Sequence, residues 1–134
     1  MERNWSEVRR EVKDFVENEV YPAESILERR DEESSKKLSE LMQLAKDKNL
    51  WALGHPKDIG GQGMPFMEYV YVNEVVGRSS PSMVALGTHS LQDSIMLREF
   101  ASKRWRDTYL EPLVAGEIFP SFAMTEPDIS SSDP

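Results

Sequence analysis

The last dozen residues of the chain combine hydroxyl side chains with a turn, a pattern that could bind a phosphate or the polar edge of a ring. Residues 122–133 read Phe-Ala-Met-Thr-Glu-Pro-Asp-Ile-Ser-Ser-Ser-Asp. Hydroxyl groups and the free backbone amides of a turn are suitable hydrogen-bond partners for an anionic group. A frayed polar tail has the same composition, so the residues alone leave both interpretations open.

The two histidines do not indicate a metal site. His55 lies in a glycine-rich stretch and His89 in an apolar one, and neither has carboxylates or a second histidine at the spacing of a metal site. We therefore expect no metal. A lone histidine is often structural, so His89 is expected to be a half-buried, hydrogen-bonded residue, with ligand contact as the alternative.

Two further clusters have structural interpretations. Gly60, Gly61 and Gly63 lack the preceding strand of a dinucleotide-binding loop and the Lys-Ser or Lys-Thr end of a P-loop. They indicate a tight connection between helices. The carboxylates from Glu28 to Glu33 indicate a solvated helix end rather than a paired acid and base.

Composition limits the function further. The chain has 134 residues, enough for one domain, with 24 acidic and 16 basic residues and a net charge of −8. This charge disfavours nucleic-acid binding. The absence of cysteine excludes disulfides, cysteine nucleophiles and thiolate metal sites. No apolar run approaches the roughly 20 residues of a transmembrane helix, and no signal peptide begins the chain, so a soluble intracellular protein is expected.

The elements that position these residues are mostly helices. The first is expected from Asn4, with Pro22 bending or ending it near Val20. Its apolar stripe has helical spacing and consists of Trp5, Val8, Val12, Phe15, Val16 and Val20. A second helix is expected to start with Asp31 or Ser34 as its cap, and its core positions are Leu38, Leu41, Met42 and Ala45.

The second helix is expected to end at Asn49 in a left-handed conformation, and residues 54–65 form a loop. A third helix is predicted from Phe66 to a stop at Gly77. Its expected face comprises Phe66, Tyr69, Val70, Asn73 and Val76, widened by Val72 and Val75.

Ser80 and Pro81 predict the cap and first position of a fourth helix that runs to about Phe100. Val84, Thr88, Leu91 and Ile95 share one face of it. A fifth helix is predicted from a cap at Ser102 to Gly116, with its last turn distorted by Pro112.

Residues 118–124 form a β-prone run after Gly116, interrupted by Pro120. A single strand cannot satisfy its own backbone, so we expect it to pair with material beyond residue 134, as if the chain were cut short. The sequence predicts an all-α fold, an up-and-down bundle of about five helices with a short unpaired β extension. The expected division is a helical domain over 1–116 and the start of a truncated β domain over 117–134.

Several blocks of the sequence resemble the acyl-CoA dehydrogenase family. The run Phe-Ala-Met-Thr-Glu-Pro from Phe122, ending in Ser-Asp at 132–133, is similar to that family's Phe-Ala-Leu-Thr-Glu-Pro…Ser-Asp signature. Residues 109–117, 50–56 with 60–63, and 73–79 are similar to its further blocks, in the same order. Five residues separate Pro127 from Asp133, one more than in the common version, which resembles the branch of family members 10 and 11.

The resemblance implies an amino-terminal helical domain, a middle β domain and a carboxy-terminal helical bundle, with FAD between the last two. It implies that Phe122, Met124 and Thr125 lie along the flavin, and that Ser131 and Ser132 lie near its pyrophosphate. Hydroxyls and amides suit phosphate and a flavin that gains negative charge on reduction. The implied cofactor-binding set is Phe122, Met124, Thr125, Ser130, Ser131 and Ser132.

The implied reaction removes the α-proton of a fatty acyl-CoA while the β-hydride passes to the flavin, which gives a trans-2-enoyl-CoA. The family's base lies in its carboxy-terminal domain, so the 134-residue chain is expected to be inactive. Ser132 is implied to lie near the acyl-CoA, and Thr88 and Leu91, with Val84 and Gly87, to line the acyl cavity. Packing between helices is the alternative for this last group.

The resemblance also implies partners and a compartment. An electron-transfer flavoprotein or another acceptor takes the electrons, and the full-length protein is a homo-oligomer, a dimer or a tetramer. A bacterial enzyme would be cytoplasmic and a eukaryotic one mitochondrial or peroxisomal. The alternatives are an acyl-CoA oxidase of the same superfamily, and a non-catalytic helical interaction module that has lost the cofactor.

Overall fold

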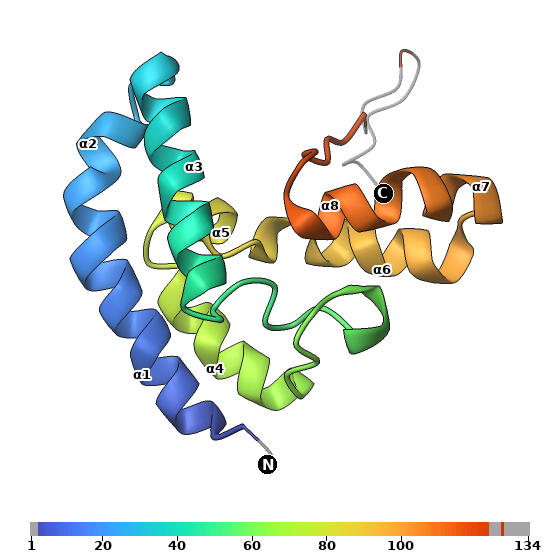
Figure 1. Ribbon diagram of the computed structural model, residues 1–134, viewed down its shortest axis with the longest axis horizontal. Helices are drawn as coiled ribbons and strands as arrows, with labels where there is room; N and C mark the ends of the chain where they lie inside the picture. Colours follow the sequence, from blue (N-terminus) through green and yellow to red (C-terminus); the bar gives the residue numbers. More distant parts are fainter. Residues whose placement is uncertain (1–2, 124–126, 128–134) are drawn as a thin grey trace.

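A computed structural model describes residues 3–123 and residue 127. Within that part the chain forms six helical rods and no strand (Figure 1). The first rod, from α1 to α2 (residues 5–27), packs against α3 (Glu32–Asp47) as an antiparallel hairpin. On the other side of the molecule, α6 (Leu91–Phe100) and the rod from α7 to α8 (residues 103–115) form a second hairpin. The helices α4 and α5 lie between the two hairpins. The expected all-α bundle is confirmed.

The first rod consists of four consecutive segments with three kinds of helical turn. It comprises α1 (Trp5–Phe15), a π-helical stretch (Val16–Val20), a 3₁₀ turn (Tyr21–Ala23) and α2 (Glu24–Leu27). Proline has no amide hydrogen to donate four residues back, and the amide of Tyr21 donates to the carbonyl of Val16. The expected interruption near Val20 is therefore a widened turn. The predicted core stripe is buried at Val8, Val12, Phe15, Val16 and Val20.

The helix α3 (Glu32–Asp47) begins and ends as the sequence predicts. The side chain of Asp31 accepts a hydrogen bond of 2.8 Å from the amide of Ser34. Asn49 has a left-handed backbone with φ of 55°. Leu41, Met42 and Ala45 are buried in the hydrophobic core.

We expect Asp31→Ala to lower the free energy of unfolding by about 1 kcal/mol, because the first amides of α3 lose their acceptor. Asp31→Asn keeps a side-chain oxygen at the cap and is the matched control, with an expected change below about 0.5 kcal/mol. Urea denaturation monitored by circular dichroism measures both. Equal losses in the two variants would show that the cap does not stabilise this helix.

The helix α4 (Phe66–Val76) buries only part of the apolar face that its sequence predicts. Phe66 is 76% exposed and Val70 is 43% exposed, whereas the buried residues are Val72, Val75 and Val76. The reason is its contact with α1, which approaches from the side of Val72 and Val75. The predicted face is therefore correct at Val76 and at its lateral residues Val72 and Val75, and wrong at Phe66 and Val70.

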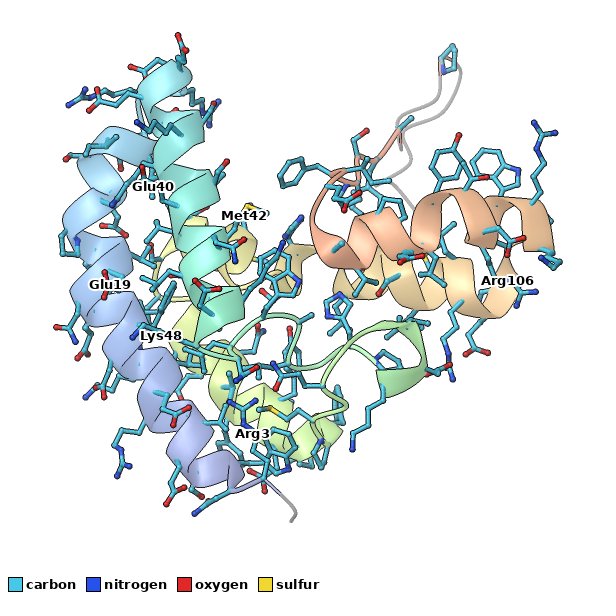
Figure 2. All side chains as sticks on the ribbon, viewed as in Figure 1. Arg3, Glu19, Glu40, Met42, Lys48 and Arg106 are labelled. Carbon is cyan, nitrogen blue, oxygen red and sulfur yellow. The ribbon has the colours of Figure 1, made fainter. Side chains whose placement is uncertain are left out.

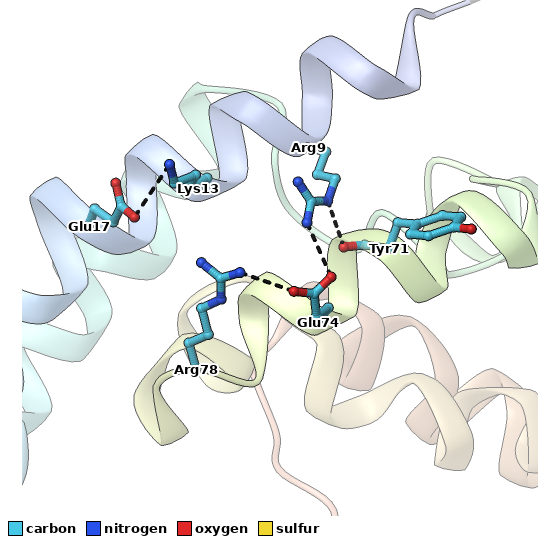
Figure 3. Close-up of polar contacts among 6 residues, drawn as sticks. All are labelled: Arg9, Lys13, Glu17, Tyr71, Glu74 and Arg78. Carbon is cyan, nitrogen blue, oxygen red and sulfur yellow. Dashed lines mark hydrogen bonds and ion pairs between the residues drawn. The ribbon is translucent and has the colours of Figure 1, made fainter.

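Polar contacts flank this α1–α4 packing (Figure 3). Arg9 of α1 donates to the backbone carbonyl of Tyr71 at 3.0 Å and to Glu74 at 3.2 Å. Arg78 donates to the other oxygen of Glu74 at 3.0 Å. Hydrogen bonds from Arg78 and Arg9 lower the pKa of Glu74, which therefore stays ionised and bridges the two helices.

The fourth helix of the sequence analysis is two helices. The structure contains α5 (Ser80–Ala85), a 3₁₀ turn (Thr88–Ser90) and α6 (Leu91–Phe100), with a break at Gly87. Ser79 rather than Ser80 is the residue that precedes α5, and its hydroxyl donates to Glu24 at 2.5 Å. The expectation of one continuous helix is wrong because Gly87 adopts a left-handed φ of 68°, which interrupts the helix.

The last rod comprises α7 (Lys103–Trp105), a π-helical stretch (Arg106–Leu110) and α8 (Glu111–Ala115). The hydroxyl of Ser102 accepts from the amide of Trp105 at 3.4 Å, so the predicted cap is confirmed. The widened turn precedes Pro112, one turn earlier than expected. Gly116 ends the rod with φ of 77°.

The β-prone run after Gly116 forms no strand as far as it is described, residues 117–123. Its apolar side chains are exposed, namely Ile118, Phe119 and Phe122. Its pairing with further material stays a prediction. No helix in the described residues is long and apolar enough to cross a membrane.

Candidate functional site

A groove of about 520 Å³ lies where α4 passes the break between α5 and α6. Four segments contribute to its walls: α4, α5, the 3₁₀ turn and α6. The lining residues are Tyr69, Asn73, Met83, Thr88, His89, Leu91, Gln92, Ile95 and Met96.

The break at Gly87 determines which predicted residues enter this groove. Thr88 and Leu91, two of the three predicted substrate-binding residues, both line it, and the third, Ser132, lies outside the described residues. Val84, which helical spacing put on the same face, lines a different groove with Leu27 and Leu38 on the α2–α3 side. Because the helix is interrupted at Gly87, helical periodicity no longer relates residues before the break to residues after it. The expectation that Val84 joins this face is therefore wrong.

The groove carries polar groups but no carboxylate or cationic side chain among its lining residues. The hydroxyl of Thr88 donates to the carbonyl of Met83 at 3.2 Å, and Tyr69 donates to Asn73 at 3.4 Å. Burial raises the pKa of Tyr69 and lowers the pKa of His89. Both side chains are therefore neutral near pH 7, and the groove can accept an uncharged, largely apolar chain.

His89 is half-buried, as expected, and it also lines the groove. Its Nδ1 lies 3.4 Å from the carbonyl oxygen of Met83, and its Nε2 is buried without a hydrogen-bond partner in the described residues. The ring of Phe119 packs against it, with 5.4 Å between ring centroids. The segment that follows Gly116 therefore touches one wall of the groove.

His55 lies beneath this wall, a placement that the sequence did not predict. It is 1% exposed, and its Nε2 lies 3.1 Å from the hydroxyl oxygen of Ser90, next to His89 in the chain. Burial, with a smaller contribution from His89, lowers the pKa of His55 from 6.5 to about 4. The flanking apolar residues Leu50 to Leu53 were the signal that this part of the loop is buried.

Sequence reasoning also missed most of the groove walls. Tyr69 was assigned to the core face of its helix, and Met83 and Met96 were not singled out. Met83 is 42% exposed and Met96 is 51% exposed, and together they form an apolar surface on the groove. This signal is a property of the folded chain, so the sequence alone could not supply it.

Of the six predicted cofactor-binding residues, the structure describes Phe122, which is 63% exposed. Met124, Thr125, Ser130, Ser131 and Ser132 lie outside the described residues. In the described part of the chain, no group of three or more histidine and carboxylate side chains is arranged to hold a metal ion.

The comparisons with known proteins agree on one family. Residues 4–117 match the family model described as acyl-CoA dehydrogenase, N-terminal domain. Acyl-CoA dehydrogenase family member 11 of Gallus gallus is 30% identical over 98% of this chain and 18% of its own length. Family member 10 of Mus musculus is 30% identical over 89% of this chain and 12% of its own length.

A solved structure assigned to the acyl-CoA dehydrogenases, from Mycobacterium abscessus, superposes with a TM-score of 0.81 at 28% identity. The match covers 96% of this chain and 36% of that chain. The present chain thus spans less than a fifth of the two relatives and about a third of the solved structure. Because the family model matches most of the chain and the helical fold agrees, this protein belongs to the acyl-CoA dehydrogenase family, to its N-terminal domain.

Proposed function

We propose that this chain is the N-terminal part of an FAD-dependent enzyme that oxidises a fatty acyl-CoA to a trans-2-enoyl-CoA. In this proposal the groove at the α5–α6 break is one wall of the site for the acyl chain. The observation that carries it is the neutral, largely apolar groove lined by Thr88 and Leu91. The segment that leads to the predicted flavin residues contacts this groove, because Phe119 packs against His89.

The groove suits a hydrocarbon chain of variable length. Leu91, Ile95, Met83 and Met96 supply apolar surface, and methionine side chains adapt to irregular ligands. A charged head group such as that of CoA would lack partners here, because none of the lining residues is ionised near pH 7. The thioester end of the substrate would therefore lie outside the groove, toward the segment after Gly116.

The described part of the predicted cofactor segment fits FAD in its chemistry. Phe122 exposes a phenyl ring that can pack against a flat heterocycle. In the proposal Phe122, Met124 and Thr125 flank the isoalloxazine ring. Ser130, Ser131 and Ser132 face its phosphates, with Ser132 also close to the acyl-CoA. FAD, when bound, supplies the hydride acceptor.

The residues of this chain bind and orient in this proposal, and they do not take the substrate proton. No carboxylate lines the groove, and the lowered pKa of His89 makes that side chain a weak base. We propose that the base belongs to a part of the protein outside this chain, so the 134-residue chain alone is inactive. An electron-transfer flavoprotein or another acceptor and a homo-oligomeric full-length enzyme belong to the same proposal. The division at residue 116 stays a prediction.

The decisive experiment purifies the full-length protein that contains this chain. We expect it to be yellow with bound FAD, and to be bleached by fatty acyl-CoA without oxygen, while the 134-residue chain produces no enoyl-CoA. A folded, colourless protein that takes up no FAD would contradict the proposal and favour the helical interaction module. Prompt release of hydrogen peroxide on substrate addition would favour the acyl-CoA oxidase.

Leu91→Asp tests the groove within that protein. A carboxylate at Leu91 would be desolvated by the bound chain, so we expect kcat/KM for a long-chain acyl-CoA to fall about tenfold or more. Phe100→Asp places the same charge at the 85% exposed end of α6 and is the matched control. Equal effects of the two substitutions would remove the groove from the proposed substrate site.

A further inference from the structure

We propose that Trp51 is a positioning residue, which fixes the direction in which segment 117–123 leaves the helical body relative to the groove. The geometric part of this inference rests on the contacts of Trp51 and on those of Lys46, which also binds the end of α8. Its meaning for catalysis rests on the proposed function, because only there does the segment lead to the flavin and the groove hold the acyl chain.

The indole ring of Trp51 lies against two left-handed turns, at Gly87 and at Gly116, that border the site. Gly87 and Gly116 have φ of 68° and 77°. A Cβ atom at Gly87 would lie 2.6 Å from the indole Cε2, and one at Gly116 would lie 2.7 Å from the indole Cζ2. The ring therefore occupies the space next to both glycines, and these two turns close on one side chain.

Polar contacts tie the same ring to the end of α8. The indole Nε1 donates to the carbonyl of Val114 at 2.8 Å in a buried hydrogen bond. The ammonium group of Lys46 donates to the carbonyl of Ala115 at 2.8 Å, and it lies 4.7 Å from the centroid of the Trp51 ring. The last carbonyls of a helix have no intrahelical donors, so these two side chains supply donors to the carbonyls of Val114 and Ala115 at the end of α8.

The two turns have different consequences for the site. The turn at Gly87 begins the 3₁₀ turn that presents Thr88 and His89 to the groove. The turn at Gly116 directs the following segment so that Phe119 reaches the ring of His89. Met42, on the side of α3 toward α8 in Figure 2, closes the Gly116 turn, with its Cε 2.9 Å from the position of an added Cβ.

Trp51→Phe tests the proposal in the 134-residue chain. Phenylalanine keeps an aromatic ring at the site but has no donor for Val114 and fills less of the space between the glycines. NMR spectroscopy reads the result as nuclear Overhauser effects between the rings of Phe119 and His89, and as the ring-proton shifts of His89. Phe119→Ala provides the His89 shifts for a segment that no longer makes the contact.

We expect the folded Trp51→Phe variant to lose the nuclear Overhauser effects between the rings of Phe119 and His89. Its His89 ring-proton shifts should move more than halfway to those of Phe119→Ala. Trp105→Phe is the matched control, because Trp105 is 56% exposed on α7, and its spectra at His89 should equal those of the unchanged chain. Folded Trp51→Phe with an intact Phe119–His89 contact would overturn the proposal and leave Trp51 as a core residue only.

Lys46→Met keeps the test decisive if Trp51→Phe does not fold. It removes the donor to Ala115 and retains the indole ring, so we expect weakened Phe119–His89 effects in a folded protein. An unchanged contact in Lys46→Met would then overturn the proposal. These spectra require no cofactor, so a full-length protein without FAD would contradict the proposed function and leave this result as it stands.

Discussion

Replacing Gly61 with alanine is expected to lower the free energy of unfolding by about 3 kcal/mol or more. A Cβ atom at Gly61 would lie 2.1 Å from the carbonyl oxygen of His55 and 2.3 Å from its Cβ. These are atoms of the backbone and of a buried side chain, and the same carbonyl accepts a 2.8 Å hydrogen bond from Gly63. No rotamer change can relieve such an overlap, so the loop itself would have to move.

The matched control is Gly60→Ala, one residue earlier in the same loop. Gly60 has φ of 95°, but its nearest neighbour to an added Cβ is a side-chain methyl of Val114 at 3.7 Å. The substitution therefore causes backbone strain without overlap, at a cost of about 1 kcal/mol. Urea denaturation of both variants measures the difference. A Gly60→Ala loss as large as that of Gly61→Ala would contradict the steric explanation.

The effect of Gly61→Ala should extend to the groove. His55, which the new methyl group would displace, lies beneath the wall formed by Ser90 and His89. We therefore expect its contact with Ser90 to change in any molecules that remain folded, which the ring-proton shifts of His55 would show. Gly60→Ala should leave those shifts unaltered.

The second large effect is a loss of stability on acidification that arises from His55. Burial in the native state lowers the pKa of this imidazole from 6.5 to about 4. As the pH falls below 6.5, the unfolded chain binds a proton at His55 that the folded chain does not bind until about pH 4. Stability from this group is complete above pH 6.5 and is lost between the two values, by about 3 kcal/mol in all.

His55→Gln isolates this contribution from that of the 24 acidic residues, which also respond to acid. The free energy of unfolding of the unchanged chain and of the variant is measured by urea denaturation from pH 7.5 to pH 4. We expect the fall over this range to be smaller in the variant by about 3 kcal/mol. The neighbouring charged and titratable groups are the same in both proteins. His89 remains close to residue 55, and so does Asp93, whose charge offsets part of the lowering of the His89 pKa by burial.

Parallel curves for the two proteins would show that His55 does not carry this dependence. A chain that gains stability relative to the variant as the pH is lowered would contradict the sign of the shift, because a raised pKa of His55 would then be required. The lowered pKa keeps His55 uncharged near pH 7, beneath a groove whose lining residues are also neutral at that pH.

The sequence by itself determined the features of this protein that depend on interactions between residues close together in the chain. The stripe from Val8 to Val20 follows from helical periodicity, and the caps at Asp31 and Ser102 follow from the first few amides of each helix. Gly116 ends the last rod for the same kind of reason, since a left-handed terminal residue favours glycine. The ordered blocks that resemble the acyl-CoA dehydrogenases identified the family that the comparisons confirm.

Only the tertiary structure decided how these helices present a site. The face that α4 buries depends on where α1 packs, so Val72 and Val75 are core residues while Phe66 is exposed. Gly87, at the break between α5 and α6, packs against the indole ring of Trp51, which lies in a distant part of the sequence. Periodicity within one segment carries no information about such a neighbour, which is why Thr88 and Leu91 reach the groove and Val84 does not.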